Sequence, residues 1–234
     1  FKCVVANPSD SNFDGCVQLN DLLDLLSAYG NCAAEESPWQ CGDPLEYQGY
    51  DYETVQIGEQ CWFAENLRAE NYRNGEAIPT DLSDSEWGGT AEGATAVYGG
   101  SPNCSNLYSP DACDSVVSLA QYGRLYNWYS VGDLRGLCPS SWHVPTDEEW
   151  TVLVENVGGS GEPGNELKYE NGWTEGGGGT NSSGFSALPG GGRYSNGGSN
   201  FAGKFGIWWT ATPSGTGIWK LSLIHISEPT RPSQ

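Results

Sequence analysis

Residues 122–157 read YGRLYNWYSVGDLRGLCPSSWHVPTDEEWTVLVENV and contain the clearest helix signal in the chain. Thr146 is a suitable N-cap, and Glu149 follows it at the spacing of a capping box. Acidic residues fill the first turn, where the helix dipole favours them. Apolar residues then recur with the spacing of one buried helix face, at Trp150, Leu153, Val154 and Val157. We therefore predict one main helix over residues 146–157, ended by two glycines.

The composition favours a loop-rich α+β protein with an aromatic core. The 234 residues include 33 glycines, 10 tryptophans and 12 tyrosines. Abundant glycine, asparagine and serine indicate short strands and many turns, and scarce aliphatic residues leave Trp and Tyr to fill the core. The predicted strands are 52–57, 60–64, 207–209 and one beginning at Trp219, with a hairpin turn at Asn74-Gly75 and long loops at 80–118 and 158–200. The expected core tryptophans are Trp62, Trp128, Trp142, Trp150 and Trp208.

The charge balance narrows the range of partners. Ten lysines and arginines against 30 acidic residues give a formal net charge of -20. Nucleic acids and anionic membranes require basic patches, so neither is expected as a partner. No segment approaches the roughly 20 apolar residues of a membrane-spanning helix. We expect a secreted or cell-surface protein with no transmembrane segment.

The eight cysteines of so acidic a chain indicate disulfides formed in an oxidising compartment, and no CxxC metal motif is present. Sequence proximity favours two local pairs, Cys41 with Cys61 and Cys104 with Cys113.

The N-terminal cysteines allow more than one pairing. A predicted helix over residues 19–29 would hold Cys16 about 16 Å from Cys32, beyond the roughly 7 Å that a disulfide spans. We therefore favour Cys3 with Cys32.

Residues 10–21 have the spacing of a calcium-binding loop, with a glycine at the sixth position, where the chain must turn sharply. Ca²⁺ prefers six to eight oxygen ligands, and an amphipathic helix follows the loop at once. The loop and helix resemble one calcium repeat of a dockerin, although a dockerin has two repeats and Asp21 stands where EF-hands carry a bidentate glutamate. The predicted calcium ligands are Asp10, Asn12, Asp14, the carbonyl of Cys16, Gln18 and Asp21.

The predicted regions are a calcium repeat at 1–32, an acidic linker at 33–43, a main domain at 44–220 and a tail at 221–234. The tail begins LSLIHISEPTR, which resembles the translation of a transposase sequencing adapter. We therefore expect the native sequence to end near Lys220 and the tail to pack against nothing. The chain has no methionine, so we expect Phe1 not to be a translation start.

Five motifs occur in the order found in the Fibrobacter succinogenes major paralogous domain family. They are QCWFAENLR (60–68), YGRLYNWYSV (122–131), CPSSWHVPTDEEW (138–150), GFSALPGGGR (184–193) and GIWWTAT (206–212). Residues 44–220 resemble this family, which implies a C-type-lectin-like fold with a small twisted antiparallel sheet and long loops. The resemblance also implies a secreted or surface location, and a later cysteine as the missing partner of Cys138.

No catalytic constellation is apparent. His143 directly precedes the helix cap between apolar neighbours, which favours a structural role. Residues 144–150 resemble the helix start of formylglycine-generating enzymes, but the capping box explains that pattern. The calcium-bridged sugar motif of C-type lectins is interrupted at residues 162–165 by Gly164.

Adjacent Trp208 and Trp209 must face opposite sides of a strand. The outward ring could stack on a sugar or pack beneath a loop, and the sequence leaves both readings open. The candidate ligand-binding residues are Trp209, Tyr194, Asn196 and Asn200.

We accordingly predict a non-catalytic binding or adhesion module that takes calcium as cofactor and an extracellular glycan or surface protein as partner. A surface-structural or assembly protein is one alternative and would self-associate without a ligand. An enzyme of the formylglycine-generating type is the other and would need a cysteine-based site.

Overall fold

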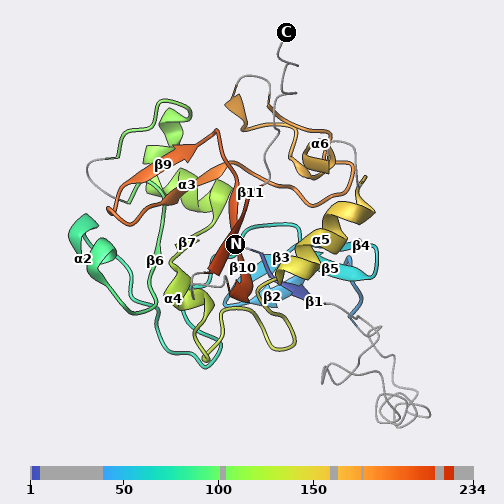
Figure 1. Cartoon of the computed structure of the whole chain (residues 1–234), viewed down its shortest axis with the longest axis horizontal. Helices are drawn as coiled ribbons and strands as arrows, with labels where there is room; N and C mark the ends of the chain where they lie inside the picture. The colour runs from blue at the N-terminus through green and yellow to red at the C-terminus, as the bar shows by residue number, and fades with distance from the viewer. Residues whose placement is uncertain are drawn as a thin grey trace.

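The computed structural model describes residues 2–5, 39–100, 104–158, 163–174, 177–213 and 219–223. The predicted calcium loop, residues 10–21, lies outside them. The described chain is a mixed α/β structure with small antiparallel sheets and short helices (Figure 1), as predicted. In chain order the elements are β1 (Val4–Val5), β2 (Leu45–Tyr47), β3 (Tyr50–Tyr52), β4 (Thr54–Ile57), β5 (Gln60–Phe63), α2 (Asp84–Gly89), β6 (Thr95–Ala96), the 3₁₀ helix η1 (Pro110–Cys113), α3 (Ser115–Tyr122), β7 (Leu125–Tyr126), α4 (Trp128–Val131), α5 (Asp147–Asn156), α6 (Pro163–Leu167), β8 (Gly190–Arg193), β9 (Ser199–Ala202), β10 (Ile207–Pro213) and β11 (Trp219–Leu223).

Strand β5 lies at the centre of a three-stranded sheet of order β1-β5-β4, and all four of its residues are buried. Successive side chains of a strand point to opposite faces. Trp62 therefore packs on one face, with its ring centroid 5.0 Å from that of Trp150 in α5. Phe63 packs on the other face, 4.7 Å from Trp142. The strand thus separates two aromatic core clusters.

The main helix forms as predicted. Thr146 is the N-cap of α5, and Glu149 completes the capping box by accepting a 2.7 Å hydrogen bond from the Thr146 backbone N–H. Trp150 and Leu153 are buried, and Val157 is the C-cap. Figure 1 shows α5 beside the sheet of β1, β5 and β4.

The N-terminal strand belongs to this core. Val4 pairs with Trp62 of β5 and exchanges two 3.1 Å backbone hydrogen bonds with His143. Cys3 forms a disulfide with Cys138, with Cα atoms 5.8 Å apart. The predicted Cys3–Cys32 pair is therefore wrong, as is the expectation that Cys138 lacks a partner in this chain. The error arose because sequence separation carries no information about a pair 135 residues apart.

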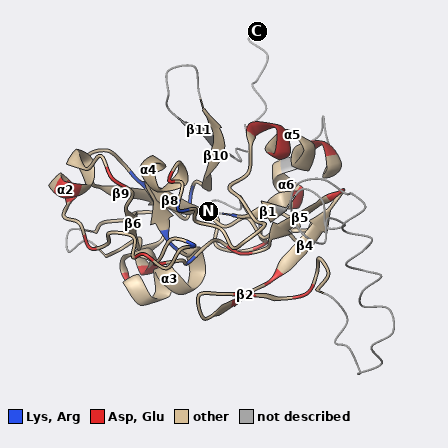
Figure 2. Cartoon of the chain, turned by 90° about the horizontal axis from the view of Figure 1, so that it is seen from below, with Lys and Arg blue, Asp and Glu red and all other residues tan. Residues whose placement is uncertain are grey.

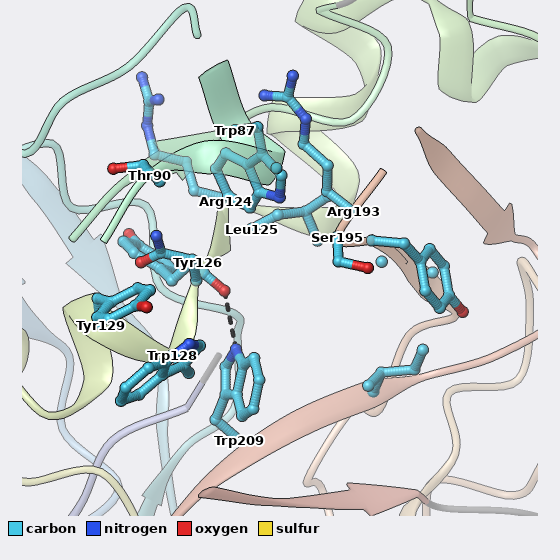
Figure 3. Close-up of a pocket in the computed structure, with 16 residues that line it drawn as sticks. Trp87, Thr90, Arg124, Leu125, Tyr126, Trp128, Tyr129, Arg193, Ser195 and Trp209 are labelled. Atoms are coloured by element: carbon cyan, nitrogen blue, oxygen red, sulfur yellow. Dashed lines mark hydrogen bonds between the residues drawn. The ribbon is translucent and has the colours of Figure 1, made fainter. Parts of the chain in front are cut away.

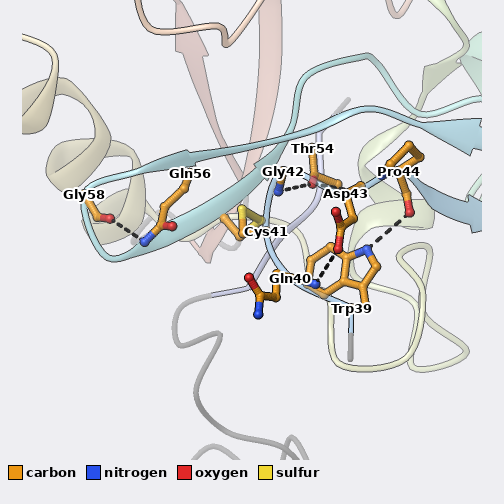
Figure 4. The surroundings of a disulfide bond; sticks show 10 residues. Trp39, Gln40, Cys41, Gly42, Asp43, Pro44, Thr54, Gln56 and Gly58 are labelled. Carbon is orange, nitrogen blue, oxygen red and sulfur yellow. Dashed lines mark hydrogen bonds between the residues drawn. A yellow bond between two sulfur atoms is a disulfide. The ribbon is translucent and has the colours of Figure 1, made fainter. Parts of the chain in front are cut away.

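Both local disulfides are confirmed, Cys41 with Cys61 and Cys104 with Cys113. The first anchors a turn that the sequence assigned to the linker (Figure 4). In this turn the backbone N–H of Gln40 donates to Asp43, and that of Gly42 donates to Thr54 of β4, each at 2.9 Å. Residues 39–43 therefore belong to the folded domain.

The two predicted long loops contain regular structure. Residues 80–118 include α2, β6 and η1, and residues 158–200 include α6 and the β8–β9 hairpin. The Asn74-Gly75 turn forms, but only an isolated bridge between Asn71 and Ala77 accompanies it.

Strand β10 is longer than predicted and pairs with β11. In this pair, Trp209 of β10 is opposite Leu221 of β11, and Ile207 of β10 is opposite Leu223 of β11. The expectation that the tail from residue 221 contacts nothing is therefore wrong for residues 221–223. Backbone pairing requires an extended chain rather than particular side chains, so the open edge of β10 accepts this segment.

Candidate functional site

A cleft of about 390 Å³ opens between four parts of the fold: α2, the β7–α4 segment, the β8–β9 hairpin and β10 (Figure 3). Its volume is within the roughly 300–1,000 Å³ of small-molecule sites. The lining residues are Trp87, Gly88, Thr90, Arg124, Leu125, Tyr126, Asn127, Trp128, Tyr129, Gly191, Gly192, Arg193, Tyr194, Ser195, Ile207 and Trp209.

Strand β10 contributes Trp209. Its neighbour Trp208 is 2% exposed and packs in the cluster beneath α5, whereas Trp209 is half-buried and faces the cleft. The indole Nε1 of Trp209 donates a 2.8 Å hydrogen bond to the Tyr126 carbonyl (Figure 3), which fixes the ring at the base of the cleft. Its ring also packs against the core cluster that contains Phe63 and Trp142, as the packing reading predicted, and the stacking of a sugar on its other side stays a prediction.

The β7–α4 segment contributes two rings that contact each other at a tilt of 32°. Asn127 is the N-cap of α4; its Oδ1 accepts hydrogen bonds from the backbone N–H groups of Ser130 and Ala94. This cap directs the chain so that the Trp128 and Tyr129 rings lie 3.8 Å apart, centroid to centroid. Trp128 was predicted to be core, which is wrong: it is half-buried and lines the cleft.

The opposite wall is the tip of the β8–β9 hairpin, fastened to α2 by Arg193. The guanidinium donates to the carbonyls of Gly197 at 2.9 Å and Leu82 at 2.7 Å, and lies 4.5 Å over the Trp87 ring. It also forms a 3.3 Å ion pair with Asp84. Tyr194, 39% exposed, projects from this wall, and partial burial raises the pKa of its hydroxyl.

Two glycines allow this wall to pack closely. A Cβ at Gly88 would lie 2.3 Å from the Ser195 carbonyl oxygen, and one at Gly197 would lie 2.2 Å from the Cα of Asp84. Gly197 also has a φ of +83°, which L side chains rarely adopt. The hairpin tip and α2 are therefore in backbone contact.

Arg124 forms part of the lining between the two walls. Its side chain is only 9% exposed and forms an ion pair with Glu70, whose side chain is 66% exposed. Its Nε is buried and has no hydrogen-bond partner among the described residues. A buried donor without a partner lowers stability, and because this atom has no accessible surface it is enclosed by the protein rather than open to the cleft.

The structure brings only part of the predicted ligand set together. Trp209 and Tyr194 line the same cleft, but Asn196 and Asn200 do not. The Asn196 side chain instead accepts a 3.0 Å hydrogen bond from the Gly198 backbone, and Asn200 is exposed on β9. The predicted calcium ligands, Asp10, Asn12, Asp14, Cys16, Gln18 and Asp21, lie outside the described residues.

Sequence reasoning missed the contributions of α2 and Arg193. A signal for α2 was available, because Ser83 and Glu86 form a capping box. No comparable signal was available for Arg193, because its partner Asp84 lies more than 100 residues away along the chain.

His143 occupies a structural position. Its Nε2 lies 2.8 Å from Glu149 Oε1, beside the cap of α5. Burial would raise the pKa of the Glu149 carboxyl, but hydrogen bonds from His143 and the Thr146 backbone outweigh it and lower that pKa. The pair holds the helix start in place.

A second cleft of about 370 Å³ lies on another part of the surface and includes Glu53, Glu65, Arg68 and Tyr169. Within the described ranges, no group of three or more His, Cys, Asp or Glu side chains could hold a metal ion. No helix in the described part of the chain is long and apolar enough to cross a membrane.

Fold and site together define a disulfide-stabilised mixed α/β domain with an aromatic surface cleft. Residues 55–230 match the Fibrobacter succinogenes major domain family (Fib_succ_major), which covers more than half of the chain. The chain therefore belongs to this family, as the motifs predicted. No curated protein and no solved structure matches it.

Proposed function

We propose that this protein is a non-catalytic binding module of the cell surface or of secreted proteins, and that its aromatic cleft holds an extracellular glycan. The observation that carries the proposal is the placement of aromatic rings on both sides of one cleft. Trp209, Trp128 and Tyr129 lie on one side, and Tyr194 and Trp87 contribute to the other. Flat apolar rings pack on the C–H faces of sugars, while their polar tips remain available for hydroxyl groups.

The polar lining suits binding better than turnover. The lining also includes Thr90 and Ser195, whose hydroxyls can exchange hydrogen bonds with sugar hydroxyls, whereas the Asn127 side chain is engaged in the cap of α4 and with the Glu92 carbonyl. The described lining residues include no Asp, Glu, His or Cys, the side chains that usually serve as acid–base pairs or as cysteine nucleophiles. The three disulfides between described residues are typical of proteins that function in an oxidising compartment.

Two finer assignments accompany this proposal. The antiparallel β1-β5-β4 sheet beside α5 supports a C-type-lectin-like arrangement, which an experimental structure would test. The ligand spacing of residues 10–21 supports a bound calcium ion that orders the N-terminal repeat. Titration calorimetry should show calcium binding to the wild type and none to Asp10→Ala; equal heats would refute it.

The test of the cleft uses two tyrosines of matched exposure. Tyr194 is 39% exposed in the cleft, and Tyr169 is 41% exposed beside the second cleft. On a glycan array, Tyr194→Ala should lose most of the wild-type signal, whereas Tyr169→Ala should retain it.

Hydrolase and oxidase screens should run in parallel with the array. Reproducible turnover abolished by His143→Ala, with no glycan bound, would overturn the proposal. Self-association without any ligand would instead favour the assembly alternative.

A further inference from the structure

We propose that the cleft is selective for uncharged glycans, chains of neutral pyranose sugars without carboxylate, sulfate or ammonium groups. This inference rests on the proposed function and specifies the ligand class of the same site. It follows because each arginine that lines the cleft is already paired with an acidic side chain of the protein.

The two arginines of the lining are both occupied. Arg193 is bound to two carbonyls and to Asp84, and its guanidinium stacks on Trp87. Arg124 is paired with Glu70. In Figure 3 both guanidinium groups lie at the upper edge of the view, away from the Trp209 ring. An anionic sugar would therefore have to compete with a protein carboxylate for each of them.

The charge of the whole protein also disfavours anionic chains. With a formal net charge of -20, the molecule repels a polyanion in its approach. Figure 2 shows acidic positions spread from α2 to α5, with few basic positions to offset them. A Debye length of about 8 Å at physiological ionic strength screens only part of this repulsion near the surface.

The described lining of the cleft also offers no carboxylate to pair with a cationic sugar. The two nearby acids, Glu70 and Asp84, are paired with the arginines. An ammonium group entering the cleft would lose its hydration without gaining an ion pair.

What the cleft offers is a set of rings and neutral hydrogen-bonding groups. The neutral groups include the hydroxyls of Thr90 and Ser195, which can exchange hydrogen bonds with sugar hydroxyls. Recognition would then depend on stacking and shape, so the affinity should vary little with salt.

The test compares oligosaccharides of equal length that differ in charge and in one small substituent. One pair is methyl-esterified and de-esterified oligogalacturonide; another is N-acetylated and deacetylated chito-oligosaccharide. Neutral gluco-, xylo- and manno-oligosaccharides complete the panel. By calorimetry at low salt, at least one neutral oligosaccharide should bind, and both charged members should bind at least about tenfold more weakly than the best neutral ligand.

A charge variant sharpens the comparison. Glu70→Gln frees Arg124 of its partner and should increase the affinity for the acidic oligogalacturonide, whereas Glu59→Gln, an exposed position in the β4–β5 turn, should not. Preferential, salt-sensitive binding of an acidic or amino sugar by the wild type would overturn the selectivity and leave the proposed function standing. Absence of binding to every saccharide, neutral or charged, would overturn both.

Discussion

The core around β5 and the wall of the cleft are built by different means. Around β5, aromatic side chains interlock on both faces of a strand and against one well-capped helix. The cleft wall depends on one arginine that joins a hairpin to α2, and on glycines that let two backbones touch. The core should therefore determine stability, whereas the wall should determine binding, and the two functions can be separated by mutation.

The largest loss of stability should follow removal of a core ring. Trp62→Ala deletes a fully buried indole that packs on Trp150 and Phe185, and should lower the free energy of unfolding by about 3–5 kcal/mol. Trp209→Ala removes a half-buried ring and should cost about 1–2 kcal/mol, yet abolish glycan binding. Urea denaturation and calorimetry measure the two effects; equal stability losses would contradict the division.

A glycine variant tests the wall. Gly197→Ala forces a Cβ against the Asp84 backbone, so it should displace the hairpin tip and weaken glycan binding. Gly75→Ala is its matched control, because Gly75 has a φ of +88° and nothing within 4 Å of the added Cβ. Both should carry a backbone strain of about 1 kcal/mol, and only Gly197→Ala should cost more than that. Unchanged binding by Gly197→Ala would show that the wall does not position the ligand.

The buried Lys2 predicts a pH dependence of stability. Burial lowers the pKa of its ammonium well below the usual value, against a weaker upward influence of Glu65. Between that lowered pKa and the ordinary lysine pKa of about 10.4, the unfolded chain binds more protons than the folded one. The contribution of Lys2 to the free energy of unfolding should therefore rise with pH across this window and be constant below it.

Lys2→Met should remove this rise, because no group then titrates at that position. Denaturation curves from about pH 7 to 9, where tyrosine with an ordinary pKa of about 10 is still mostly protonated, measure the slope. Lys204→Met, a half-buried position away from Lys2, should keep the wild-type slope. Identical slopes in the wild type and Lys2→Met would assign the pH dependence to other groups.

The smallest effect concerns the cap of α5. Thr146→Ala removes the side-chain oxygen that accepts from Glu149 N–H at 3.2 Å, and should cost about 1 kcal/mol. Thr151→Ala, on the exposed side of the same helix, should cost less than half of that. Glycan binding should be unaffected in both, since neither residue lines the cleft.

The sequence predicted those parts of the molecule whose signals are local. The capping box at Thr146, the alternation of Trp208 and Trp209 and the Cys41–Cys61 pair all lie within short stretches and were confirmed. The Cys3–Cys138 disulfide and the Arg193–Asp84 contact join segments more than 100 residues apart, so no local pattern specifies them. Trp128 was misassigned because an aromatic-rich composition indicates that tryptophans are buried without showing whether a core or a cleft receives each one.

Tryptophan resonances provide the most direct test of the central claim, since tryptophans occur in both regions. Each of the 10 tryptophans gives an indole N–H signal in a ¹⁵N correlation spectrum. On titration with the best neutral oligosaccharide, the signals of Trp209 and Trp128 should shift to saturation, while those of Trp62 and Trp150 should remain in place. Binding that leaves Trp209 and Trp128 unmoved, or that shifts Trp173 or Trp39 instead, would contradict the assignment of the cleft as the binding site.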